Sequence, residues 1–212
     1  MRFQISRESP EYTLILNACE GVLQIVCADA EKIVVSQEWY RENQATEILA
    51  PQLEAICHSL CIQPGNFTKI ACVHGPGSFT GIRLVLATAM GLSTVSGAEC
   101  AGINYLEALA CEAFLRKHLS ETRTLWVFTH ARRNLMHAQA FFSQNGEIPR
   151  PKTAVFLCDP KESLSFIAEQ SICLGSAIQR YPEIFASLCT SEKSPVIFLI
   201  ICNVECKLFV ST

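Results

Sequence analysis

A glycine-rich turn followed by a long, nearly uncharged segment constrains the fold of this chain more than any other feature. The sequence predicts a short apolar strand at Lys69–Val73, a turn that opens with GPGSFTGIR (Gly75–Arg83), and a helix at Phe79–Val95. Arg83 is the only charged residue of that helix. A helix that is apolar on every side must be covered on every side. We therefore expect one face to pack on its own lobe and another to meet a helix of a second chain.

The turn has two interpretations. A glycine turn between a strand and a helix can hold a phosphate at the positive helix end. Both common phosphate loops need a glycine at position 80, where this chain has Thr80, and the P-loop also needs a lysine after it. The favoured interpretation is a helix-entry turn in which Ser78 or Thr80 caps the helix. The residues of the predicted turn are Gly75, Pro76, Gly77, Ser78, Thr80 and Gly81.

Two successive blocks of strands and helices flank this region and predict an α/β protein of two lobes, residues 1–103 and 104–212. In the first block we expect strands at Tyr12–Leu16, Val22–Ala28 and Ile33–Val35 and a helix at Thr46–Leu60. In the second we expect helices at Asn104–His118, Lys161–Glu169 and around Ile178–Leu188, and strands at Leu125–Thr129, Leu135–Phe142, Ile172–Leu174 and Val196–Cys202.

Composition narrows the class of protein. With 212 residues, 50% of them hydrophobic, the chain is long enough for one large core or two small lobes. A net charge of -3 argues against direct, tight binding of nucleic acid. The 12 cysteines are irregularly spaced and no apolar signal peptide opens the chain, so we expect a reducing cytoplasm. The apolar run Val196–Cys202 is too short to cross a membrane.

The segment GPGSFTGIRLVLATAMGLS resembles the hallmark segment of the TsaB (YeaZ) family. Asn104–Ala110 (NYLEALA) resembles the helix start that follows it there, and Thr129–Arg133 (THARR) stands where the family has an Asp-Ala-Arg-Arg turn. The resemblance runs from Tyr12 to about Phe142 and implies an α/β, actin-like (ASKHA, ribonuclease-H-like) fold. In that fold each of two lobes has a mixed sheet flanked by helices.

The resemblance also implies a function. TsaB proteins are non-catalytic partners of TsaD and act with TsaE in transfer of a threonylcarbamoyl group to adenosine 37 of tRNAs that read ANN codons. It implies no cofactor in this chain, with ATP and metal in TsaD and TsaE, and tRNA bound only through the complex. The short apolar run argues against a membrane anchor, and an exposed apolar helix favours a homodimer of the isolated chain. The implied partner interface comprises Thr46, Leu49, Leu53, Phe79, Arg83, Leu84, Ala87, Thr88, Met90 and Gly91.

Departures from the family pattern argue against nucleotide chemistry in this chain. The first strand ends in Leu16-Asn17-Ala18-Cys19 where the family has Asp-Thr-Ser, and His130 replaces the Asp of Asp-Ala-Arg-Arg. No two histidines are four residues apart, so the His-x-x-x-His metal pair of TsaD has no counterpart. Two alternatives stay open: a stand-alone actin-like ATPase, and a glycoprotease-type peptidase, for which Ser78 lacks the G-x-S-x-G elbow.

Overall fold

The computed structural model describes residues 11–40, 44–117, 123–143, 147–168, 171–189 and 197–199. These residues fall into two compact units. The first unit contains the described residues up to Gly102 apart from Gly75–Gly77, and the second contains Gly75–Gly77 together with the residues from Ile103 on.

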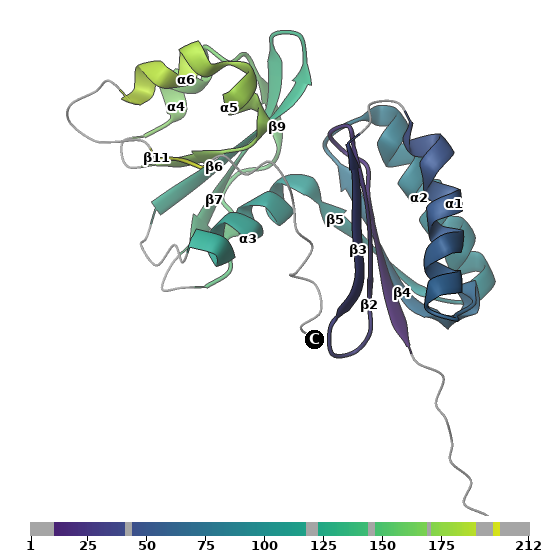
Figure 1. Cartoon of the computed structure of the whole chain (residues 1–212). Coiled ribbons are helices and arrows are strands. Elements are labelled where there is room, and N and C mark those ends of the chain that lie inside the picture. The colour runs from purple at the N-terminus through teal and green to yellow at the C-terminus, as the bar shows by residue number, and fades with distance from the viewer. Residues whose placement is uncertain are drawn as a thin grey trace, which may run out of the picture. The chain divides into compact units, whose positions relative to one another are not determined.

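The first unit is a mixed sheet with helices on one face (Figure 1). Its described strands are ordered β3-β2-β1-β4-β5, with β1 antiparallel to β2, β2 antiparallel to β3, and β1 parallel to β4. The strands are β1 (Tyr12–Asn17), β2 (Val22–Ala28), β3 (Ile33–Tyr40), β4 (Phe67–Gly75) and β5 (Glu99–Asn104). The helices are α1 (Ala45–Ser59), the 3-10 turn η1 (Pro64–Asn66) and α2 (Phe79–Ser96).

The core of the first unit lies between this sheet and the two helices. Alternate residues of β1 and β2, among them Leu14, Leu16, Leu23 and Ile25, are almost fully buried and point toward the helices. From α1 the core receives Leu49, Leu53 and Ile56, and from α2 it receives Val85 and Ala89. The periods of two in the strands and about 3.6 in α1 therefore place the apolar side chains on one common layer.

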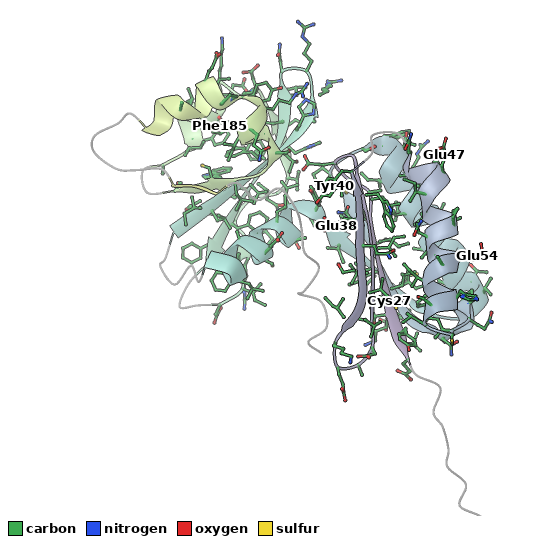
Figure 2. All side chains as sticks on the ribbon, viewed as in Figure 1. Cys27, Glu38, Tyr40, Glu47, Glu54 and Phe185 are labelled. Atoms are coloured by element: carbon green, nitrogen blue, oxygen red, sulfur yellow. The ribbon has the colours of Figure 1, made fainter. Side chains whose placement is uncertain are left out.

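The second unit begins with α3 (Tyr105–Lys117), which packs on β6. Its described strands are ordered β11-β10-β6-β7-β8, and β9 also pairs with β7. The remaining elements are β6 (Arg123–Arg132), β7 (Leu135–Ser143), β8 (Arg150–Pro151), β9 (Phe156–Cys158), α4 (Ser163–Phe166), β10 (Ile172–Leu174), α5 (Ser176–Arg180), α6 (Pro182–Cys189) and β11 (Ile197–Leu199). Figure 2 shows the side chains of both units, with Phe185 of α6 labelled.

An aromatic cluster forms the core between β6 and the last helices. The ring of Trp126 stacks on Phe128 with centroids 5.8 Å apart and lies 4.9 Å from Phe166. Phe128 in turn contacts Phe185, with 5.4 Å between the centroids. Such rings bury large apolar areas, so they hold the short helices α4 and α6 to the sheet.

The fold class predicted from the sequence is confirmed, because both units are mixed sheets flanked by helices. Several element limits differ. Strand β3 runs to Tyr40 rather than Val35, β4 and β6 are longer than predicted, and the short strands β8 and β9 were not predicted. The edge strand β5 has no counterpart among the predicted strands; the predicted helix Lys161–Glu169 is reduced to Ser163–Phe166; and the helix around Ile178–Leu188 is interrupted at Tyr181, before Pro182. For Val196–Cys202 only a strand at Ile197–Leu199 is described, so burial of its side chains stays a prediction.

The first turn of α2 lies unusually close to the end of β1. A Cβ atom built on Gly81 would stand 2.0 Å from the carbonyl oxygen of Ala18, which is far inside van der Waals contact. Only glycine fits at this position without a shift of the helix or of the strand end.

We therefore predict that Gly81→Ala lowers the free energy of unfolding by about 2 kcal/mol or more, because helix and strand must separate. Gly91→Ala, in the same helix, is the matched control, since a Cβ there meets nothing within 4 Å. The control should be neutral or raise stability by about 0.5–1 kcal/mol. Urea unfolding followed by circular dichroism measures both, and equal effects of the two substitutions would contradict the close contact.

Candidate functional site

The glycine turn connects β4 to α2, and a backbone hydrogen bond holds it next to the end of β1. Gly75 has φ of 110°, a conformation that favours glycine, and the Gly75–Pro76 peptide bond is cis. The backbone N–H of Ser78 donates to the carbonyl oxygen of Cys19 at 2.6 Å. Ser78 is the N-cap of α2, and its Oγ accepts from the N–H of Gly81 at 3.3 Å. The serine hydroxyl therefore acts as a helix cap, one of the two caps predicted from the sequence.

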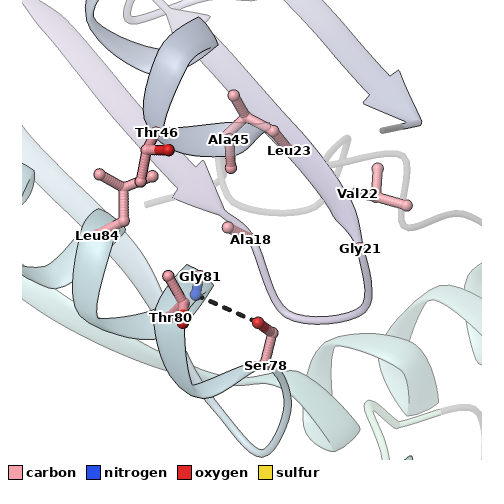
Figure 3. A pocket seen from close by; sticks show the side chains of 10 residues that line it. All are labelled: Ala18, Gly21, Val22, Leu23, Ala45, Thr46, Ser78, Thr80, Gly81 and Leu84. Carbon is pink, nitrogen blue, oxygen red and sulfur yellow. Dashed lines mark hydrogen bonds between the residues drawn. The ribbon is translucent and has the colours of Figure 1, made fainter. Parts of the chain in front are cut away.

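A small hollow lies beside this turn, between the N-terminal ends of α1 and α2 (Figure 3). Its volume is about 50 Å³, whereas sites for small molecules and cofactors usually span roughly 300–1,000 Å³. The hollow is therefore too small for a nucleotide. It brings together Thr46, Leu84 and three residues of the glycine turn. Its full lining is Ala18, Gly21, Val22, Leu23, Ala45, Thr46, Ser78, Thr80, Gly81 and Leu84.

One face of α2 is exposed and apolar. The side chains of Phe79 and Met90 are each 67% exposed, and that of Val95 is 77% exposed. Between them lie Ala87 and Gly91, which are also exposed and small. The guanidinium carbon of Arg83 lies 3.7 Å from the centre of the Phe79 ring, a cation–π contact that covers part of the ring. We call the surface formed by Phe79, Arg83, Ala87, Met90 and Gly91 the α2 face.

The residues predicted for a partner interface separate by burial into an exposed, a half-buried and a buried group. Phe79, Arg83, Ala87, Met90 and Gly91 are exposed on the α2 face, and Thr46 is exposed at the start of α1. Leu84 and Thr88 are half-buried, and Leu84 packs against the core. Leu84 and Thr88, which were predicted for the interface, thus lie beside the exposed side of α2 and only partly face the solvent.

Leu49 and Leu53 need a correction. These two residues of α1 are only 2% and 9% exposed, because they point into the core between the helices and the sheet. Their side chains are therefore structural, and in this conformation they are not available to a partner. Val95 was missed by the sequence analysis, although its position four residues after Gly91 could have indicated that it continues the same face.

Among the described residues, α2 is also a helix long and apolar enough to span a membrane, with a mean hydropathy of 1.3 over 18 residues. Of this window 17% is buried, and its buried residues Gly81, Val85 and Ala89 contact the core of the first unit. The helix α2 therefore packs on the core of the first unit with one side, and its other side is exposed.

Comparison with known proteins assigns the family. Residues 41–156, more than half of the chain, match the family model TsaD, described as tRNA N6-adenosine threonylcarbamoyltransferase. The chain belongs to this family. No curated protein matches the chain.

Among solved structures, YeaZ from Pseudomonas aeruginosa matches with a TM-score of 0.70 and 16% identity, covering 92% of this chain and 86% of that one. A second structure, of a protein described as similar to peptidase YeaZ from Pseudomonas aeruginosa, matches with a TM-score of 0.71 and 17% identity, over 90% and 84% of the two chains. At these identities the likeness establishes the fold alone. The chain is thus a member of the TsaD family with a YeaZ-like fold, and the family is one of threonylcarbamoyladenosine (t6A) biosynthesis.

In the described part of this TsaD-family chain, the residue types that can bind metals or act as nucleophiles are dispersed and do not cluster. No group of three or more His, Cys, Asp or Glu residues there could hold a metal ion. Burial raises the pKa of the Cys27 thiol to about 12, with smaller contributions from Cys57 and Asp29. Burial likewise raises the pKa of Cys158 to about 11, with smaller contributions from Glu162 and Asp159. These two thiols are therefore protonated, and weak nucleophiles, at neutral pH.

Two histidines lie on the paired strands β6 and β7 of the second unit. His130 is at the end of β6 and His137 is on β7, opposite Thr129. Burial lowers the pKa of each imidazole from its ordinary value near 6.5, and the pKa of His130 is lowered further by Arg180 and that of His137 by His130. His130 Nε2 and His137 Nδ1 are buried and have no hydrogen-bond partner among the residues the structure describes.

We predict that the second unit loses stability as the pH falls from about 7.5 through 6.5 toward the lowered folded-state pKa values. In that window the unfolded chain binds protons that the folded chain does not, so acid favours unfolding. His137→Gln should reduce the slope of unfolding free energy against pH, whereas the neighbouring Met136→Leu changes packing but removes no titrating group. Urea unfolding from pH 5.5 to 7.5 measures this, and equal slopes for the two variants would refute it.

Proposed function

We propose that this chain is the non-catalytic partner subunit of TsaD in t6A biosynthesis and that it binds TsaD through the α2 face. The observation that carries the proposal is the exposed, apolar and nearly uncharged outer side of α2. The two large side chains of the face, Phe79 and Met90, are each about two-thirds exposed to water. Exposed apolar patches on a folded unit are typical of protein interfaces, because covering them removes apolar area from water.

The shape of the α2 face suits a helix of a partner. Small residues at positions 87 and 91 leave a shallow centre, flanked by Phe79 at one end and by Met90 toward the other. A helix packs at 8–10 Å between axes when the contact side chains permit it, and alanine and glycine permit the near end of that range. Arg83 supplies a cation that can pair with one acidic group of the partner.

The chemistry of the described residues supports a role without catalysis. Ser78, the obvious candidate nucleophile, is committed to capping α2. Asn17 stands at the end of β1, and both ends of its amide are in use: Oδ1 accepts from the N–H of Cys19 and Nδ2 donates to Gln24. An amide in this position offers no carboxylate to a magnesium ion.

On this proposal the threonylcarbamoyl group passes to adenosine 37 of tRNAs that read ANN codons in the active site of TsaD. ATP and metal belong to TsaD and TsaE, and this chain meets tRNA only within the complex, in the cytoplasm. The isolated chain can also cover its α2 face with a second copy, as a homodimer.

Nucleotide binding by the isolated chain is the sharpest test against a stand-alone ATPase. Titration of the purified chain with ATP and Mg²⁺ in a calorimeter should give no tight binding, because the Asn17 amide replaces a carboxylate and is already hydrogen-bonded. A submicromolar dissociation constant would favour the ATPase over the partner role.

The α2 face itself is tested by Ala87→Arg. We expect co-elution with TsaD of the same organism in size-exclusion chromatography to be lost, with affinity reduced roughly a hundredfold, because an unpaired charge buried in an apolar interface costs several kcal/mol. The control is Ala168→Arg, the same exchange at an exposed position of the second unit, which should bind like the unchanged chain. The measure of function is t6A formation with and without each variant.

Two outcomes would contradict the proposal. If Ala87→Arg binds TsaD as tightly as the control, then the α2 face is not the interface. If the unchanged chain neither co-elutes with TsaD nor affects t6A formation, then the partner function itself is wrong.

A further inference from the structure

A chain of hydrogen-bonded side chains crosses β1, β2 and β3 at one level of the first sheet. Asn17 is directly opposite Gln24 in the pairing of β1 with β2, and Gln24 is directly opposite Glu38 in the pairing of β2 with β3. Asn17 Nδ2 donates to Gln24 Oε1 at 2.6 Å, and Gln24 Nε2 donates to Glu38 Oε1 at 2.7 Å. The core residues Leu16 and Leu23 point toward α1 and α2, so by alternation this chain lies on the opposite face of the sheet.

In this path of hydrogen-bonded side chains, every donor points from β1 toward β3. The backbone N–H of Cys19 can only donate, and it donates to Asn17 Oδ1 at 3.0 Å. This bond fixes the Asn17 amide with its nitrogen facing Gln24. Because Gln24 Oε1 accepts from that nitrogen, Gln24 Nε2 faces Glu38. The chain ends on the Glu38 carboxylate, which also accepts from the hydroxyl of Tyr40. Asn17 and Gln24 are only 4% and 3% exposed, so the bonds of Asn17 lie away from water and the bond from Gln24 to Glu38 is part-buried. Aligned hydrogen bonds in such surroundings strengthen one another.

The path of hydrogen bonds continues from Asn17 into the glycine turn. Cys19, whose N–H is held by Asn17, offers its carbonyl oxygen to the N–H of Ser78, the N-cap of α2. The residue between Asn17 and Cys19 in sequence, Ala18, supplies the carbonyl oxygen against which Gly81 is packed. The turn after β1 is thus fixed on one side by the Asn17 amide and contacts the first turn of α2 on the other.

We propose that Asn17, Gln24 and Glu38 are positioning residues that fix the N-terminus of α2 and thereby the α2 face. Through that face the proposal rests on the partner function proposed above. It also explains why position 17 holds an amide. Gln24, in the middle, needs a donor on one side and an acceptor on the other. Asn17 Nδ2 is that donor and Glu38 Oε1 is that acceptor.

The substitution Asn17→Asp tests the direction of the chain without a change in shape. The new carboxylate at position 17 still accepts from the N–H of Cys19, but it has no hydrogen to give to Gln24. If the Gln24 amide turns over to donate to that carboxylate, its oxygen then faces the Glu38 carboxylate. In the first orientation two acceptors face each other at the buried Asn17–Gln24 contact, and in the second at the part-buried Gln24–Glu38 contact, and both are unfavourable.

The reversed chain restores the pairing. In the double variant Asn17→Asp with Glu38→Gln, the new amide at position 38 donates to Gln24, and Gln24 donates to the new carboxylate at position 17. Each buried group then has a partner, with every donor of the side-chain path pointing the opposite way. Glu38→Gln alone keeps the original direction, because its Oε1 still accepts from Gln24.

The experiment compares the unchanged chain, the two single variants and the double variant by urea unfolding at neutral pH. We expect Asn17→Asp to lower the folding equilibrium constant about tenfold or more, from the cost of an unsatisfied buried polar group. Glu38→Gln alone should change it less than about threefold, and the double variant should recover at least about fivefold over Asn17→Asp. Simple addition of the two single effects would overturn the proposal.

A second measurement reads the position of α2 rather than overall stability. In amide-resolved NMR spectra, the Ser78 and Gly81 amide signals should shift in Asn17→Asp and return in the double variant, because these amides form the cap contacts. Affinity for TsaD should follow the same order. If the stability cycle and the amide signals behave as expected but no protein of the set binds TsaD, then the positioning chain stands and the partner function fails. Unchanged Ser78 and Gly81 signals in Asn17→Asp would refute the positioning role directly.

Discussion

The contact between the first turn of α2 and the backbone of Ala18 determines how the first unit is assembled. Because a side chain at position 81 has no room, the helix approaches the sheet to the distance set by its own backbone. That approach lets Val85 and Ala89, one and two turns further on, enter the core with nearly complete burial. It also decides which side of an apolar helix is left outside. The α2 face is therefore a consequence of a missing Cβ, together with the two hydrogen bonds of Ser78.

Much of the fold could be predicted from the sequence because its apolar residues come in short runs for strands and at helical spacing for helices. The apolar, β-rich runs Tyr12–Leu16 and Val22–Ala28 indicate strands, and the structure has them, buried along most of their length. The spacing of Leu49, Leu53 and Ile56 indicates a helix with one buried face, which the structure also has. Strand β5 could not be found in this way, since its first four residues are exposed and it exists by pairing with β4 at the edge of the sheet. The break between α5 and α6 was available in the sequence as Pro182.

The candidate site was less predictable for a different physical reason. A helix that is apolar on all sides carries no internal signal of which side meets the sheet, so Leu84 and Thr88 were placed outward and the structure turns them partly inward. The hydrogen-bonded chain of Asn17, Gln24 and Glu38 depends on strand register, which pairs residues up to 14 positions apart. In the second unit the buried atoms Thr129 Oγ1 and Gln139 Oε1 have no partner within the described ranges, and no spacing in the sequence foretells this.

The α2 face also limits how the sequence of this chain can change. A polar side chain at Phe79 or Met90 would make the separated chain more soluble, because each of these residues now exposes most of its apolar surface to water. The same substitution would remove the area that a partner gains by covering the face. Selection for solubility of the isolated chain and selection for partner binding therefore act in opposite directions on the same few positions. A variant improved in one of these properties is expected to be poorer in the other.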